Sequence, residues 1–269
     1  LDIMPDLSVP AGQQMPLFIH RSLRDAEIYF VANPTQEKII IDPEFRVNTD
    51  LAPQLWNPID GTVRNLPQFT PAATGQGISV PLQLEPLESA FVVFRKGLAK
   101  SEGVNYPEPN LVADLSASKW NISFDASRRG PADPLVVDSL FDWSTSSDMA
   151  IANYSGKAVY KTDFTLDALP EGHTCVDLGN VMVMAKVKVN GEYAGGAWTH
   201  PYRVDITPLL KQGDNSIEVE VVNNWRNRLI GDAALPEADR LTWTNFELVN
   251  AAEPLQSSGL LGPVRILSY

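Results

Sequence analysis

The stretch VNGEYAGGAWTHPYRVDIT, from Val189 to Thr207, concentrates side chains that can recognise a ligand. Trp198, His200 and Tyr202 lie where the loops of a predicted sandwich gather, and aromatic rings offer sugars an apolar platform for their C–H groups. An aromatic residue at such a corner can instead close the hydrophobic core. These three side chains are therefore candidate ligand-binding residues or, alternatively, a lid over the core.

The densest set of polar residues in the chain is NNWRNRLIGDAALPEADR, from Asn223 to Arg240. Proteins bind carbohydrates with planar hydrogen-bonding side chains beside an aromatic ring, and this segment has both. It is therefore a second candidate site, for a ligand or for contact with another domain. The alternative is that Arg228 and Asp232 form an internal ion pair that holds a long loop. The candidate ligand-binding residues here are Asn224, Trp225, Asn227, Arg228 and Asp232.

No catalytic residue is predicted. Asp232 with Glu237 or Asp239 would supply the two carboxylates of a glycosidase, but 33 acidic residues make such pairs common by chance. The three histidines are not spaced for a metal site or a catalytic triad. Cys175 is the one cysteine, which excludes an intrachain disulfide, and its strand-like neighbours predict a buried, inert thiol.

Charge and hydropathy exclude several partners. With 21 Lys and Arg against 33 Asp and Glu, the net charge is -12, and the chain lacks the basic surface that nucleic acids require. No apolar run approaches the about 20 residues of a membrane helix, so membrane insertion is not expected. The first residue is Leu rather than Met, which indicates a removed signal peptide or an artificial boundary; an export signal would lie outside this sequence.

The hydropathy pattern predicts an all-β sandwich protein. Short runs with alternating apolar and polar residues are interrupted roughly every ten residues by Gly, Pro, Asn or Asp. Ala185 to Val189 (AKVKV) and Ile217 to Val221 (IEVEV) each place apolar residues on one face and charged residues on the other. Asn190-Gly191 predicts a type I′ hairpin. The one helical turn expected is Pro208 to Lys211.

A composition break predicts two modules. The stretch GLAKSEGVNYPEPNL, from Gly97 to Leu111, is rich in Gly, Ser and Pro and follows the apolar strand AFVVFR. We expect a small β-sandwich over residues 1–108 and a jelly roll over residues 109–269.

The order of elements after Asn190 is VNGEYAGG, PYRVDIT, LLKQGDNSIEVEVVNNW, a long loop and SSGLLGPVRI. This order resembles the sugar-binding jelly-roll domain of glycoside hydrolase family 2, which has the galactose-binding-like fold. NNWRNRLIGDAALPEADR and SGLLGPVRI, with FIHRSLRDAEIYFVAN near the N-terminus, resemble the C-terminal region of glycoside hydrolase family 106 α-L-rhamnosidases. These families carry their catalytic carboxylates on a barrel of about 250 residues that this sequence does not contain. The resemblance therefore implies an accessory region and no catalytic residue.

The function predicted is that of a non-catalytic carbohydrate-binding or accessory region of an exported bacterial glycoside-hydrolase-like protein involved in polysaccharide degradation. Its location would be the periplasm, the cell surface or the medium, and its partner a glycan or a catalytic glycosidase domain. Two alternatives stay open: a fragment that completes the active site of an α-L-rhamnosidase-like barrel, and a purely structural scaffold between domains. No cofactor is required, and a structural calcium ion is an expectation of the galactose-binding-like fold, which often holds one.

Overall fold

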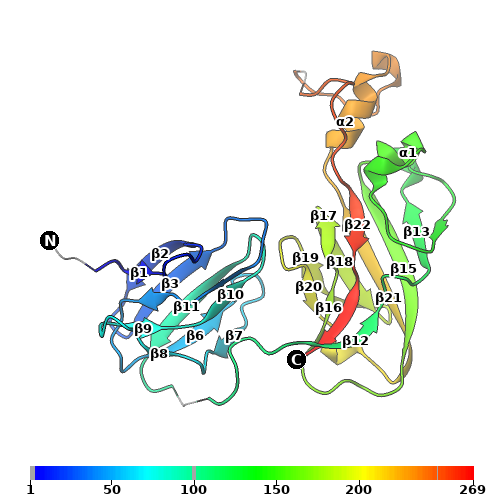
Figure 1. The fold of residues 1–269 in the computed structure, drawn as a ribbon. Helices are drawn as coiled ribbons and strands as arrows, with labels where there is room; N and C mark the ends of the chain where they lie inside the picture. The colour runs from blue at the N-terminus through cyan, green and yellow to red at the C-terminus, as the bar shows by residue number, and fades with distance from the viewer. Residues whose placement is uncertain (1–3, 99–100, 247) are drawn as a thin grey trace. The chain divides into compact units, whose positions relative to one another are not determined.

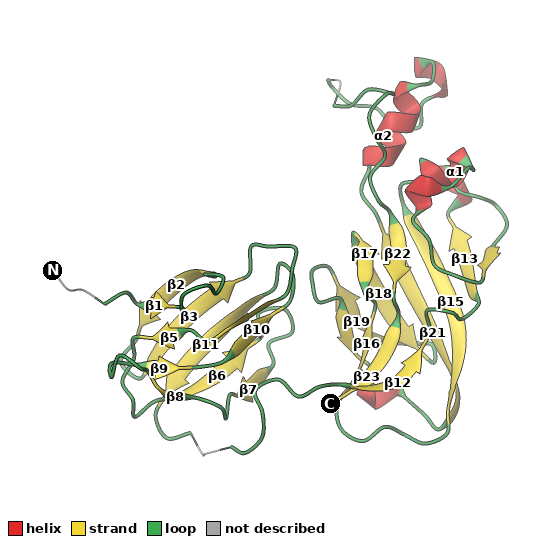
Figure 2. Cartoon of the chain, in the orientation of Figure 1, coloured by secondary structure: helices red, strands yellow, loops and turns green. Residues whose placement is uncertain are grey.

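The computed structural model describes residues 4–98, 101–246 and 248–269. Strands account for 40% of it and helices for 9%, so the prediction of an all-β protein is confirmed (Figure 2). The chain divides into two compact units, residues 1–108 and 109–269. Each unit encloses a hydrophobic core of its own.

The first unit is a β-sandwich whose layers meet through aromatic rings. One sheet has the strand order β2-β3-β11-β6-β7 and another the order β1-β5-β9-β8, with a separate pair of β10 and β4. Tyr29 and Phe94 from the larger sheet meet Phe45 from the smaller one, with ring centroids 4.8 and 5.0 Å from that of Phe45. The strands are β1 (Leu7–Ser8), β2 (Leu17–Ser22), β3 (Ala26–Ala32), β4 (Ile39–Ile41), β5 (Glu44–Phe45), β6 (Ala52–Trp56), β7 (Val63–Asn65), β8 (Thr70–Pro71), β9 (Ile78–Ser79), β10 (Leu82–Leu84) and β11 (Ser89–Arg95).

The segment predicted to link the modules is partly anchored to the first unit. Asn105 is buried; its side chain donates to the carbonyl groups of Gln68 and Pro81 and accepts from the Gln68 amide. The next residue, Tyr106, lies under the Arg64 guanidinium at 4.8 Å. Positions 99 and 100 of the predicted linker lie outside the described residues. Among the described ones, the exposed connection to the second unit begins only after Tyr106.

The second unit is a jelly roll with two main sheets (Figure 1). The larger sheet has the order β14-β13-β15-β21-β18-β19, the smaller one β12-β23-β16-β20, and β17 pairs with β22. The two longest strands, β15 and β21, pair antiparallel along their whole length at the centre of the larger sheet. The strands are β12 (Asn110–Asp114), β13 (Trp120–Phe124), β14 (Leu135–Val137), β15 (Lys157–Leu166), β16 (Thr174–Asp177), β17 (Asn180–Met182), β18 (Met184–Val189), β19 (Glu192–Ala197), β20 (Arg203–Asp205), β21 (Gly213–Val222), β22 (Gly259–Gly262) and β23 (Arg265–Ser268).

The alternation in the sequence produces the two faces of the larger sheet. Ile217, Val219 and Val221 on β21 are buried in the core. Glu218, between them, points outward and pairs with lysines on both neighbouring strands, Lys161 at 2.8 Å and Lys188 at 3.1 Å. One face of this sheet is therefore apolar and the other is solvated, as the sequence predicts.

The tight turn between β18 and β19 also follows the prediction. Asn190 and Gly191 have φ values of 54° and 85°, the positive values that a type I′ turn requires. The predicted helical turn at Pro208 to Lys211 lies slightly earlier, as the 3-10 turn η3 (Thr207–Leu209). On β16, Cys175 is buried, and burial raises the pKa of its thiol to about 11, so it is protonated and inert at neutral pH.

The prediction that the segment from Asn223 onward forms only a loop is wrong. It contains the helix α2 (Arg226–Ala233) and the 3-10 turn η4 (Glu237–Asp239). The buried residues of α2 are mostly polar, so the helix lacks the apolar periodicity by which sequence analysis finds helices. The other helical turns are η1 (Ala126–Arg128), η2 (Trp143–Thr145) and α1 (Met149–Ala152). Within the described ranges, no helix has the length and apolar character needed to cross a membrane.

Limited proteolysis tests the division of the chain. We expect the first cut between Gly97 and Asn110, with a stable C-terminal fragment, because exposed segments rich in Gly and Pro are cut before sandwiches. Asn105 and Tyr106 should be protected within that segment. Mass spectrometry of the early fragments identifies the site, and a first cut between Ala158 and Val221 would contradict the two-unit division.

Candidate functional site

The candidate site lies on an excursion that leaves the jelly roll after β21 and returns at β22. We call residues 223–258 the α2 excursion; it contains α2 and η4. Figure 1 shows α2 beyond the end of the strands of the second unit. A connection this long between two strands usually persists for a function or for docking, so its internal contacts decide which side chains are open to a ligand.

The first of these contacts is made by Asn223. Its Oδ1 accepts a hydrogen bond from the Gly156 amide at 2.9 Å, and its Nδ2 donates to the carbonyl of Tyr154 at 2.8 Å. The same Nδ2 lies 3.3 Å from Oγ of Ser258 at the end of the excursion. Asn223 therefore joins the start of the excursion to its end and to the segment that leads into β15.

Asn227 makes a second connection of the same kind. It is 1% exposed, its Oδ1 accepts from the Gln256 amide at 2.8 Å, and its Nδ2 donates to the Gln256 carbonyl at 2.6 Å. Nδ2 also donates to Oγ of Ser258 at 3.1 Å. The sequence predicts Asn227 as a ligand-binding residue, but its amide is buried and already bonded within the protein.

Arg228 and Asp232 form the internal ion pair that the sequence leaves as an alternative. Both are buried, and Nη1 of Arg228 lies 3.7 Å from Oδ1 of Asp232. The other oxygen of Asp232 accepts from the amide and the hydroxyl of Thr242 at 2.8 and 2.7 Å. Burial lowers the pKa of the Arg228 guanidinium, although the charge of Asp232 opposes this shift. The pair thus fixes α2 and the chain near Thr242, and solvent does not reach it.

The predicted corner residues differ in exposure. Tyr202 is 8% exposed and belongs to the core, and the His200 ring packs edge-on against it with centroids 4.6 Å apart. Trp198 is 54% exposed. Of the three, Trp198 therefore offers its ring most openly to a ligand, and Tyr202 packs as part of the lid that the sequence leaves as the alternative.

The sheet register places Trp198 at the same end of the jelly roll as the α2 excursion. Trp198 follows Ala197, which faces Ala185 on β18, and Ala185 in turn faces Val221 on β21. The strand β19 is two strands away from β21, which corresponds to about 10 Å. The register therefore brings Trp198 and the start of the excursion, which are distant in sequence, to one edge.

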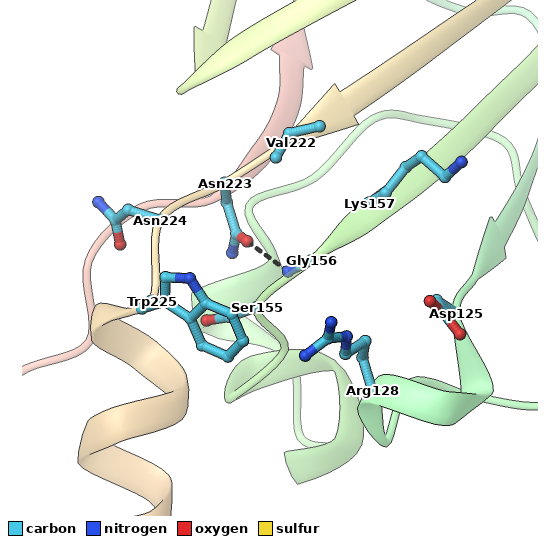
Figure 3. A pocket seen from close by; sticks show the side chains of 9 residues that line it. All are labelled: Asp125, Arg128, Ser155, Gly156, Lys157, Val222, Asn223, Asn224 and Trp225. Atoms are coloured by element: carbon cyan, nitrogen blue, oxygen red, sulfur yellow. Dashed lines mark hydrogen bonds between the residues drawn. The ribbon is translucent and has the colours of Figure 1, made fainter. Parts of the chain in front are cut away.

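An open pocket of about 270 Å³ lies where the excursion begins (Figure 3). Trp225 lines it with a ring that is 49% exposed, and Asn224 lies beside it on the surface. The Arg128 guanidinium, from η1, approaches the Trp225 ring, with Cζ 5.5 Å from the ring centroid. The sequence does not identify Arg128 as a site residue, because it lies about 100 positions before Trp225 in the chain and only the fold brings the two side chains together.

A second hollow, of about 480 Å³, lies between α2 and the later part of the excursion. Trp243, which lines it, is 81% exposed, and Phe246 and Leu248 are more than half exposed. The predicted site ends at Arg240 and leaves these residues out. The sequence feature that could have identified these residues is the presence of large apolar side chains in a stretch without helix or strand periodicity.

Both units match families of glycoside hydrolases. Residues 1–70 match the family 106 model, described as alpha-L-rhamnosidase. Residues 139–249 match the glycosyl hydrolase 2 galactose-binding domain-like family. The resemblance to α-L-rhamnosidases is confirmed. The second unit is accordingly a galactose-binding-like jelly roll.

Two longer relatives contain regions similar to all or part of this chain. The solved structure of a rhamnosidase from Novosphingobium sp. PP1Y matches with a TM-score of 0.85 and 36% identity, covering 99% of this chain and 25% of that one. A putative beta-glucuronidase from Formosa agariphila is 32% identical over 191 residues, which are 60% of this chain and 16% of the relative. The chain spans a quarter or less of either relative, and it is a region related to glycoside hydrolases.

The calcium ion expected from the galactose-binding-like fold stays a prediction. Among the residues that the structure describes, no group of three or more His, Cys, Asp or Glu side chains could hold a metal ion.

Two substitutions distinguish a side chain that holds the α2 excursion in place, Asn227, from one that is open to a ligand, Trp225. Asn227→Ala should lower the free energy of unfolding by about 2 to 4 kcal/mol, because it leaves buried groups of Gln256 and Ser258 without partners. Trp225→Ala should cost less than about 1 kcal/mol, because half of the ring is already in water. Urea denaturation followed by circular dichroism measures both. A cost of about 3 to 5 kcal/mol for Trp225→Ala would instead identify the ring as a core element.

Proposed function

We propose that this chain is a non-catalytic, carbohydrate-binding accessory region of an exported bacterial glycoside-hydrolase-like protein that acts on polysaccharides. The observation that carries the proposal is the open pocket beside Trp225, shown in Figure 3. It combines a half-exposed indole ring with the guanidinium of Arg128 and the exposed side chain of Asn224, whose amide also bonds to Gln256 and to the Arg226 amide. An apolar ring face and nearby hydrogen-bonding groups are what a sugar requires of a binding site.

The shape of the site implies a weak, exposed interaction. One ring and a few hydrogen bonds that compete with water give about 4 to 8 kcal/mol, or a Kd in the millimolar to micromolar range. Trp198, which follows β19 at the same end of the sheet, would contact a more distant unit of a longer glycan. Weak binding of this kind suits an accessory region that keeps an enzyme close to a polymer.

The relatives support the carbohydrate context. Both units match glycoside hydrolase families, and the similar region in the Novosphingobium protein is part of a much longer rhamnosidase. Catalysis under this proposal belongs to another part of the parent protein. Export is part of the proposal because polysaccharides are too large to enter the cell intact and must be bound outside it.

Contact with a catalytic glycosidase domain is a second candidate function, and the outer part of the α2 excursion favours it. Trp243, Phe246 and Leu248 expose large apolar surfaces there, and such surfaces mark contacts with other proteins. The base below them is fixed by Asn227 and by the pair of Arg228 and Asp232. A rigid base with an apolar tip is suited to completing the active site of a barrel or to packing between domains.

Binding measurements with two tryptophan variants separate the candidates. We expect glycan arrays and calorimetry to detect binding by the wild-type chain and at least about tenfold weaker binding by Trp225→Ala, without a fall in Tm. Trp243→Ala is the matched control and should bind like the wild type. If the wild type binds no glycan, carbohydrate binding is refuted, and docking or a scaffold role is the reading that survives.

Activity measurements test the non-catalytic part of the proposal. The chain alone should release no product from aryl rhamnosides, galactosides or pectic polysaccharides. Turnover that disappears in an Asp232→Asn variant would overturn this part of the account. Because Asp232 is buried and bonded to Thr242, a loss of folding must be excluded in that variant by thermal melting.

A further inference from the structure

We propose that the pocket beside Trp225 selects a sugar unit that carries an anionic group, and that Arg128 determines this specificity. The inference rests on the proposed carbohydrate-binding function and goes beyond it, because a ring and an amide alone would accept neutral sugars. The argument depends on which charges in the pocket are already neutralised.

Arg128 is a cation of the pocket that forms no close ion pair, although its charge acts at longer range on Asp125. In the described part of the chain, no carboxylate lies within 4 Å of its guanidinium, and its side chain makes no hydrogen bond. Its neighbour Arg129 differs: it donates to the carbonyl of Asp239 and lies 4.0 Å from Asp232. Arg226 pairs with Glu253. The five donors of Arg128 are therefore free for a ligand.

The other charged groups of the pocket are engaged within the protein. Lys157 lies 3.3 Å from Glu220 on the neighbouring strand. Asp125 caps η1: its Oδ1 accepts from the amide and the hydroxyl of Ser127, and these bonds lower the pKa of its carboxyl. Figure 3 shows the Arg128 guanidinium directed towards the Trp225 ring, whereas the Lys157 side chain points away from that ring. The side of the pocket next to Trp225 is thus locally positive in a chain of net charge -12.

The geometry suits an anion attached to a sugar ring. The planar guanidinium can hold a carboxylate or a sulfate group through two parallel hydrogen bonds, which a lysine ammonium cannot do. The Trp225 ring beside it is still half exposed and can contact the C–H groups of the sugar. The volume of about 270 Å³ is below the about 300 Å³ at which pockets for larger ligands begin, so it suits a single sugar unit.

Calorimetry with three oligosaccharides of equal length tests the inference: an oligogalacturonate, a sulfated oligogalactose and a neutral oligogalactose. The wild-type chain should bind at least one anionic oligomer about tenfold more tightly than the neutral one at low salt, and the difference should shrink as salt screens the charge. The two anionic oligomers decide between carboxylate and sulfate.

Three variants complete the test. Arg128→Gln should abolish the preference for the anionic oligomer and retain binding of the neutral one. Arg128→Lys should keep only part of the preference, because the ammonium group cannot form two parallel hydrogen bonds. Lys161→Gln removes an equal charge from β15, at a residue that pairs with Glu218 and lies outside the pocket, and should leave the preference intact. Thermal melting should give the same Tm for Arg128→Gln as for the wild type, because this side chain is exposed.

The failures of the inference and of the proposed function are distinguishable. Equal binding of neutral and anionic oligomers, lost in Trp225→Ala, would refute the inference and leave the carbohydrate-binding function in place. A preference for anions that Arg128→Gln does not change would refute the role of Arg128. Absence of binding to all three oligomers, with none on glycan arrays, would refute both.

Discussion

Hydrogen bonding by two side-chain amides, those of Asn223 and Asn227, is the constraint on which the candidate site depends. Together they join the chain at Tyr154 and Gly156, the start of the α2 excursion and its end at Gln256 and Ser258. Trp225 lies between the two asparagines in sequence, so its backbone is held from both sides while its side chain stays half exposed to solvent. A side chain positioned in this way loses little freedom when it binds a ligand, which favours affinity.

Asp142 also holds the end of the α2 excursion in place. Its carboxylate accepts hydrogen bonds from the amides of Ser144 and Ser258 and from the hydroxyl of Ser257. Burial acts to raise the pKa of this carboxyl, but the hydrogen bonds outweigh it and the pKa is lowered. Because the folded pKa lies below the unfolded one, this stabilisation is present above the unfolded pKa and is lost as the pH falls through the folded pKa. The base of the site is therefore intact at neutral pH.

The parts of the fold that follow from periodicity and turn chemistry could be predicted from the sequence. Alternation predicts the faces of β18 and β21, and Asn190-Gly191 predicts the hairpin, because both signals are local. The helix α2 could not be found in this way, since its buried face carries Asn227, Arg228 and Asp232 in place of apolar residues. Those side chains bond to Gln256 and Thr242, which lie later in the chain, and only the folded chain shows these partners.

In the candidate site too, the sequence predicts residues that are close together in the chain, but not those that only the fold brings together. The polar segment and its resemblance to the family 2 sandwich predict Trp225 and Asn224 as site residues, whereas the structure adds Arg128, which η1 brings to the Trp225 ring. Composition also cannot separate polar residues that bind ligands from those that hold a loop. Here the distinction is burial, because Asn227 and Asp232 are enclosed while Asn224 and Trp225 are exposed.

The most direct test of the account is the position at which a sugar contacts the chain, measured by NMR titration of the tryptophan indole N–H signals. On addition of an anionic oligosaccharide, the Trp225 signal should shift progressively and the Trp243 signal should not, because the pocket lies at the base of the excursion and Trp243 at its exposed outer part. A shift of the Trp243 signal with an unchanged Trp225 signal would contradict the account and place binding on the outer part of the α2 excursion.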